Sequence, residues 1–126
     1  MDTQKKRTAL VVEDHLGQGM VFKAALELAG FRAVLAQNGP KAMAELSNGL
    51  PDLILLDLHL PGMRGDDLLK QIEQDYGLDG TRVIVATGDP ALGETLEGKV
   101  TLVLKKPLGF SHLQQVAHQI LAVAPH

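Results

Sequence analysis

Short apolar runs alternate with longer stretches of helical periodicity from one end of the chain to the other. The apolar runs occupy residues 10–12, 32–35, 52–56, 83–86 and 100–104. Most of them lack polar alternation, which is typical of strands that are buried on both faces. Strands of this kind, joined by helical segments, predict βαβ units and a parallel sheet, and so place the chain in the α/β class.

The helical segments are recognised by the residues at which they start and stop. The first covers residues 15–29 and ends at Gly30, and the second covers 41–47. The third follows the negative charges of 66–67, and the last extends from Ser111, as N-cap, to Val123. The first segment carries apolar residues near helical spacing, namely Met20, Phe22, Ala24, Ala25 and Leu28. Residues 61–65 are predicted to form a loop.

Polar residues stand where four of the apolar runs end. Glu13 and Asp14 follow the first run, Asp57 the third, Thr87 the fourth and Lys106 the fifth. Ligands bind beyond the carboxyl ends of the strands in open α/β sheets, so these side chains are expected to converge there. Carboxylates that lie together favour a hard cation such as Mg²⁺, and a lysine opposite them can pair with a phosphoryl oxygen. The pattern therefore predicts metal-assisted phosphoryl transfer to a carboxylate.

Composition and charge exclude several classes of function. The absence of Cys excludes disulfides and Cys-ligated metals, and is compatible with a cytoplasmic protein. The net charge of −3 gives no electrostatic footprint for direct binding of nucleic acid. No apolar stretch approaches the roughly 20 residues of a membrane-spanning helix, so no membrane insertion is expected. The only basic run lies within residues 1–7, which are predicted to form a mobile N-terminal tail.

Four sequence motifs at these strand ends resemble those of response-regulator receiver domains from two-component signalling. They are Val11-Val-Glu-Asp14, Leu55-Leu-Asp-Leu-His-Leu-Pro-Gly-Met-Arg-Gly65, Val85-Ala-Thr87 and Lys105-Lys-Pro107. The resemblance covers nearly the whole chain. It implies a flavodoxin-like, doubly wound, five-stranded parallel sheet in the order 2-1-3-4-5, with helices on both faces. It also implies a single receiver domain over residues 1–126, apparently stand-alone.

The resemblance assigns a role to each polar residue at the strand ends. Asp57 corresponds to the phosphoacceptor, with Thr87 and Lys106 contacting the phosphoryl group. Glu13 and Asp14 correspond to the acidic pair that holds Mg²⁺ as cofactor, together with Asp57 and the backbone carbonyl of His59.

The resemblance also indicates which partners the chain would have. The phosphate would come from a histidine kinase or a histidine phosphotransfer protein, and phosphorylation would switch binding of a downstream protein that the sequence does not identify. Such a protein is a phosphoacceptor with slow aspartyl-phosphate hydrolysis and not a stand-alone enzyme. The family also implies a cis peptide bond between Lys106 and Pro107.

The chain departs from the family pattern on one side. Val103 stands where the family usually has Tyr or Phe, three residues before the active lysine, so a rotating aromatic ring cannot report phosphorylation here. Residues 89–98 contain one Pro and two Gly, which predicts a short or irregular fourth helix. Phosphotransfer therefore looks intact, whereas the readout looks altered.

Other functions compete with this interpretation. The chain could be the N-terminal receiver fragment of a DNA-binding response regulator, or a pseudo-receiver that binds its partner without phosphorylation. A flavodoxin would need a Ser/Thr/Gly-rich phosphate loop after the first strand, where this chain has Glu13 and Asp14. A haloacid-dehalogenase-type phosphatase would need a second Asp two residues after the nucleophile, where this chain has His59.

Overall fold

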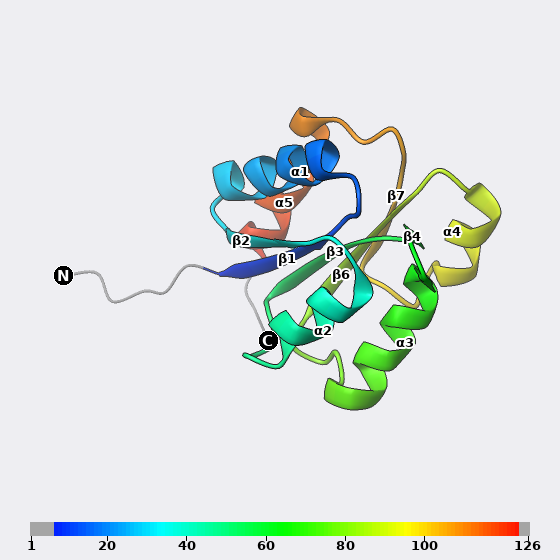
Figure 1. Cartoon of the computed structure of the whole chain (residues 1–126). Coiled ribbons are helices and arrows are strands. Elements are labelled where there is room, and N and C mark those ends of the chain that lie inside the picture. Colours follow the sequence, from blue (N-terminus) through cyan, green and yellow to red (C-terminus); the bar gives the residue numbers. More distant parts are fainter. Residues whose placement is uncertain (1–6, 124–126) are drawn as a thin grey trace.

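The computed structural model describes residues 7–123 and has a five-stranded parallel sheet at its centre (Figure 1). The strand order is β2-β1-β3-β6-β7, which is the predicted order 2-1-3-4-5 once the two short strands of a separate hairpin are left out of the numbering. The sheet strands are β1 (Thr8–Val12), β2 (Arg32–Ala36), β3 (Leu53–Asp57), β6 (Arg82–Thr87) and β7 (Leu102–Lys105).

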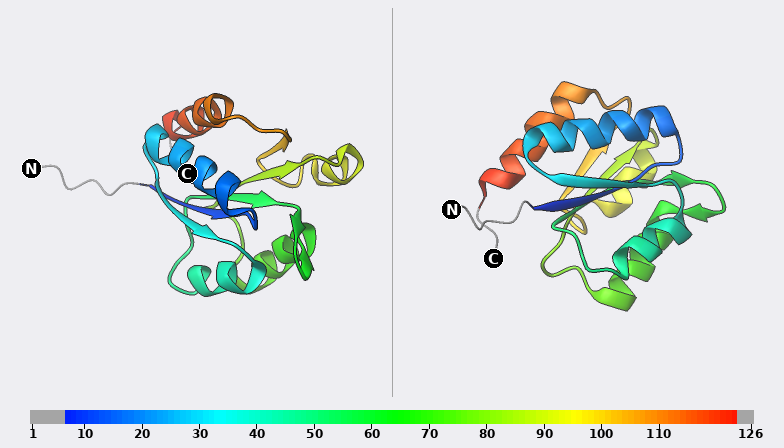
Figure 2. Two further views of the ribbon diagram at one scale, coloured as in Figure 1. Left: turned by 45° about the horizontal axis from the view of Figure 1, so that its top comes forward. Right: turned by 60° about the vertical axis from the view of Figure 1, so that its left-hand side comes forward.

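Helices cover both faces of this sheet. Helices α1 and α5 lie side by side on one face, and α2 and α3 lie on the other, while α4 lies beside β6 and β7 (Figures 1 and 2). The helices are α1 (Leu16–Ala29), α2 (Gly39–Leu46), α3 (Gly65–Tyr76), α4 (Pro90–Leu96) and α5 (Phe110–Ala122). The described residues contain no helix that is long and apolar enough to span a membrane.

The alternation of side chains along each strand divides the core into two layers. In β1, Ala9 and Val11 pack against the layer under α1 and α5, whereas Leu10 and Val12 pack against the layer under α2 and α3. All five residues of β3 are buried. The central strands are therefore shielded on both faces, which explains their continuous apolar runs.

Several local predictions differ from the structure. Within α1, Phe22 and Ala25 are buried as expected, but the other three members of the apolar set are exposed, Met20 at 51%, Leu28 at 64%, and Ala24 as well. Their exposure places these side chains on the solvent-facing surface of α1. At α5 the predicted N-cap Ser111 is wrong, because the helix begins at Phe110 and its N-cap is Gly109, two residues before the predicted one.

The segment predicted as a loop, residues 61–65, forms the turn and the second strand of a small antiparallel hairpin and the first residue of α3. The strands of the hairpin are β4 (His59–Leu60) and β5 (Met63–Arg64), which pair with each other and not with the main sheet. The turn between them includes Gly62, whose φ is +75°. The hairpin connects the end of β3 to the start of α3, and so forms one wall beside Asp57.

The fourth helix is short, as predicted, with only seven residues. The side chain of Asp89 caps it by accepting hydrogen bonds from the N–H groups of Ala91 and Leu92. Gly93 is buried within the helix, where an added Cβ would lie 3.1 Å from Val103 Cγ1 and 3.2 Å from Thr87 Cγ2. Gly93 therefore lets α4 lie close against β6 and β7, whereas the sequence alone indicates only that this glycine weakens the helix.

The predicted N-terminal tail falls on residues 1–6, which lie outside the described residues, and on Arg7. The backbone carbonyl of Arg7 accepts a hydrogen bond from the N–H of Arg32 at 2.8 Å. Arg7 therefore extends the pairing between β1 and β2.

The N-cap of α1 is a histidine, whose Nδ1 accepts a hydrogen bond from the N–H of Gln18 at 3.1 Å. We expect His15→Ala to lower the free energy of unfolding by about 1 kcal/mol, because that N–H loses its partner. His15→Asn should lower it less, since a shorter side chain with an acceptor oxygen can still cap the helix. Urea denaturation of both variants would check this, and equal stability of His15→Ala and the parent would contradict it.

Candidate active site

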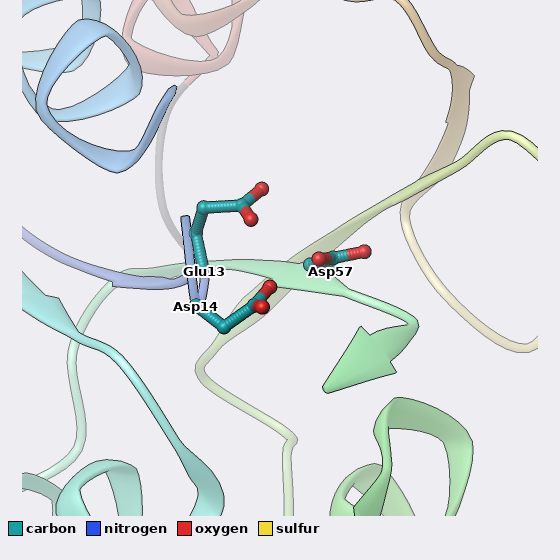
Figure 3. A group of neighbouring side chains, drawn as sticks. All are labelled: Glu13, Asp14 and Asp57. Atoms are coloured by element: carbon teal, nitrogen blue, oxygen red, sulfur yellow. The ribbon is translucent and has the colours of Figure 1, made fainter. Parts of the chain in front are cut away.

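The predicted site residues gather at the carboxyl edge of the sheet. Glu13 and Asp14 directly follow β1, Asp57 and Thr87 are the last residues of β3 and β6, and Lys106 follows β7. These strands are parallel, so their ends meet at one edge. The side chains of Glu13, Asp14 and Asp57 project from neighbouring strand ends into the same space (Figure 3).

The three carboxylates form a compact cluster. One oxygen from each of Glu13, Asp14 and Asp57 lies within 4.8 Å of the other two. Glu13 and Asp57 are 1% and 4% exposed, whereas Asp14 lies at the surface. Hard carboxylate oxygens with one open side suit a Mg²⁺ ion, which keeps several water ligands. The cluster is typical of the magnesium site of a receiver domain, and its donor set fits the predicted ion.

Lys106 brings a positive charge to this cluster. Its Nζ lies 3.0 Å from Glu13 Oε1 and 3.3 Å from Asp57 Oδ1. Lys105, the neighbouring residue, is exposed on the edge strand β7. Of the two lysines, Lys106 therefore contacts the carboxylates, and its role toward a phosphoryl group stays a prediction. The peptide bond between Lys106 and Pro107 is cis, as predicted.

Glu13 occupies an electrostatically unfavourable position. Burial raises the pKa of its carboxyl above the usual value, and the nearby charge of Asp57 acts in the same direction. Hydrogen bonds from Lys106 Nζ and from the N–H of His15 oppose this rise of the pKa. A cation bound between the carboxylates would stabilise the charged form of Glu13 further.

Two groups contact the same carboxylate oxygen of Asp57. Its Oδ1 accepts a hydrogen bond from the N–H of His59 at 3.0 Å and faces Lys106 Nζ. The side chain of His59 is exposed on the hairpin. The metal-ligating role predicted for the backbone carbonyl of His59 stays a prediction.

Thr87 is buried at the site, but its hydroxyl is engaged elsewhere. Its Oγ1 accepts a hydrogen bond from the N–H of Asp89 at 3.0 Å. The hydroxyl therefore bonds to the start of α4 and not to the three carboxylates. The role of Thr87 in contacting a phosphoryl group on Asp57 stays a prediction.

Gln18 is a site residue that the sequence did not reveal. Its Oε1 accepts a hydrogen bond from Lys106 Nζ at 3.2 Å, although the two residues are 88 positions apart. A lone glutamine in the first turns of a helix carries no sequence signal for such a role.

Comparison with known proteins agrees with this geometry. The family model described as "Response regulator receiver domain" matches residues 9–118. The chain belongs to the response regulator receiver domain family. A receiver domain structure (CheY-like) from Methylobacillus flagellatus superimposes with a TM-score of 0.81 at 27% identity, covering 92% of this chain and 99% of that chain. The fold expected from the sequence is thus confirmed.

Curated relatives of this receiver domain differ widely in length. The "Probable methanogenesis regulatory protein FilR2" of Methanothrix harundinacea is 32% identical over 122 residues, which cover 88% of this chain and 79% of that protein. Hybrid signal transduction histidine kinase M of Dictyostelium discoideum is 33% identical over 82% of this chain, which spans only 5% of that protein. The sensory/regulatory protein RpfC of Xanthomonas campestris pv. campestris is 34% identical over 64% of this chain, which spans 11% of its length.

Membership of the family establishes the general role. The chain is a receiver domain of two-component signal transduction, with an acidic pocket and Lys106 at the carboxyl edge of its sheet. Receiver domains are typically phosphoacceptors and not stand-alone enzymes, and histidine kinases phosphorylate them.

Proposed function

We propose that this receiver domain accepts a phosphoryl group on Asp57 from a phosphohistidine and thereby switches its affinity for a protein partner. The observation that carries the proposal is the environment of the Asp57 carboxylate. It is buried at the end of the central strand β3, it faces Lys106 Nζ at 3.3 Å, and it shares a cluster with Glu13 and Asp14. The proposed nucleophile, Asp57, therefore has a positively charged group and two further candidate metal ligands directly beside it.

In the proposed reaction an Asp57 carboxylate oxygen attacks phosphorus as the phosphorus–nitrogen bond to the histidine breaks. The imidazole leaves and takes up a proton, and the product is an aspartyl phosphate. Lys106 would pair with a phosphoryl oxygen, and the hydroxyl of Thr87 would donate a hydrogen bond to another. Asp57 stays aligned because the N–H of His59 holds one of its oxygens.

The residues that would hold Mg²⁺ are Glu13, Asp14, Asp57 and the backbone carbonyl of His59. When bound, the ion would neutralise charge on the phosphoryl oxygens and orient them. The carboxylate cluster supports this assignment, because three carboxylates lie close together and the single ammonium of Lys106 offsets only part of their mutual repulsion.

The phosphodonor is proposed to be a histidine kinase or a histidine phosphotransfer protein. This follows from the usual donor of receiver domains and from the relative described as a hybrid signal transduction histidine kinase. We also propose that the chain acts in the cytoplasm, where receiver domains usually operate.

The direct experiment is incubation with acetyl phosphate in the presence and absence of Mg²⁺. We expect intact-mass measurement to show one added phosphoryl group with Mg²⁺ and none when a chelator removes the metal. Trapping the acyl phosphate by borohydride reduction and mapping the peptide should locate it at Asp57. If no phosphoryl group is added, the interpretation as a pseudo-receiver replaces this proposal.

Metal binding should depend on Asp57. Mg²⁺ should raise the melting temperature of the parent by mass action, and Asp57→Ala should diminish that rise because one ligand is lost. Without Mg²⁺, we expect Asp57→Ala to leave the free energy of unfolding unchanged or to raise it. Loss of the contacts to Lys106 and His59 is offset by relief of repulsion with Glu13 and Asp14. Thermal melts with and without metal would check this, and clear destabilisation of the metal-free variant would contradict it.

A further inference from the structure

The ammonium of Lys106 has three oxygen partners, and only two of them are carboxylates. Nζ lies 3.0 Å from Glu13 Oε1 and 3.3 Å from Asp57 Oδ1, and it donates to the amide oxygen of Gln18 at 3.2 Å. The ammonium therefore donates hydrogen bonds to Glu13 and Gln18 and forms an ion pair with Asp57. The side chain of Lys106 is only 19% exposed, and Gln18 is half-buried.

The position of Gln18 in α1 makes this contact unusual. Gln18 is the third residue of the helix, where Gln or Glu commonly bonds back to the N–H of the N-cap residue. Here that N–H, on His15, donates instead to Glu13 Oε2 at 3.2 Å. The carboxylate of Glu13 thus accepts the hydrogen bond from the N-cap N–H. The side-chain amide of Gln18 is left to accept a hydrogen bond from Lys106.

The three partners of Lys106 have different roles in the proposed reaction. Glu13 would ligate the metal and Asp57 would carry the phosphoryl group, so both carboxylates change partners during the reaction. Gln18 is neutral and has no part in either event. Its bond to Lys106 can therefore persist from the resting protein to the phosphorylated one.

We propose that Gln18 is a positioning residue that holds the Lys106 ammonium over Asp57. This inference rests on the proposed function of Asp57. Lysine is a compact charge on a flexible four-carbon stem, so an uncharged anchor restricts the ammonium to the place where phosphoryl charge develops. A carboxylate at position 18 would compete with the phosphoryl group for that ammonium, whereas an amide competes less.

The test is Gln18→Met, which keeps an unbranched side chain of similar length and removes the acceptor. With phosphoramidate as donor and saturating Mg²⁺, we expect the maximal phosphorylation rate to fall about fivefold to tenfold, the scale of one ordinary hydrogen bond. The dissociation constant for Mg²⁺ is measured separately, because Lys106 also contacts the proposed metal ligands Glu13 and Asp57, and saturating Mg²⁺ keeps a change in metal affinity out of the rate. Gln119→Met, the same change at an exposed position of α5, should match the parent.

A double-mutant cycle separates positioning from a general structural effect. In a Lys106→Ala background, Gln18→Met should cause no further loss of rate. The proposal is overturned if Gln18→Met alone keeps the parental rate, if the loss is equally large without Lys106, or if the variant fails to fold. Failure of the proposed function has a different signature, since the parent itself would then remain unphosphorylated.

Discussion

Asp57→Asn should abolish phosphorylation by acetyl phosphate in the presence of Mg²⁺. The amide has a similar shape and can still accept the hydrogen bond from the N–H of His59, but it lacks the charged oxygen that attacks phosphorus. Among the three clustered carboxylates, that of Asp57 is the one on the central strand that both faces Lys106 and accepts from the hairpin backbone. Intact-mass measurement over a time course would report the loss.

Asp67→Asn provides the matched control, because Asp67 is an exposed carboxylate in the first turn of α3. It should be phosphorylated at the parental rate. Phosphorylation of Asp57→Asn to the same extent as the parent would show that another residue is the acceptor. The assignment of Asp57 would then be wrong, while membership of the family would stand.

Gly65→Ala should destabilise the fold and impair the site together. A Cβ at this position would lie 2.5 Å from the backbone oxygen of Asp57 and 2.6 Å from the Cα of Leu58. Both contacts are with backbone, which cannot turn aside as a flexible side chain can. We expect a loss of about 3 kcal/mol in the free energy of unfolding, measured by urea denaturation. The phosphorylation rate should also fall, because relief of the clash displaces the residue that carries the nucleophile.

Gly80→Ala is the appropriate comparison for this prediction. A Cβ at Gly80 would meet nothing within 4 Å, so this change should leave stability nearly unchanged or raise it slightly. If Gly65→Ala were as stable as Gly80→Ala, the close approach of α3 to the end of β3 would not be a constraint on the fold.

Much of the architecture could be predicted because each strand carries its own signal. A strand such as β3, buried at all five residues, is continuously apolar, and the residue that ends it is polar. Chain order and the parallel arrangement then place the strand ends at one edge. Glu13, Asp14, Asp57, Thr87 and Lys106 could therefore be named together before any distance was known.

The sequence predicted burial and helix boundaries less well where tertiary packing overrides local residue preferences. The periodicity of α1 includes Met20 and Leu28, yet both are largely exposed, because α1 and α5 lie side by side on one face of the sheet and leave the outer side of α1 open. The N-cap of α5 was predicted at Ser111 from its residue type, whereas the helix starts after Gly109. Propensity alone does not fix a helix boundary when neighbouring packing determines where the chain turns.

The spatial order of the strands was implied by the family resemblance. By itself, the sequence indicated where the strands lie along the chain, the edge at which the polar residues gather and the chemistry predicted for the site. It could do so because apolar periodicity and strand-end residues are local properties of the chain. Only the tertiary structure decided that Gln18 from α1 contacts Lys106, 88 residues away, and that the hydroxyl of Thr87 is engaged at the start of α4. These contacts depend on how helices dock on the sheet. Docking is set by the packing of many residues, so the types of the two residues that come into contact do not predict the contact.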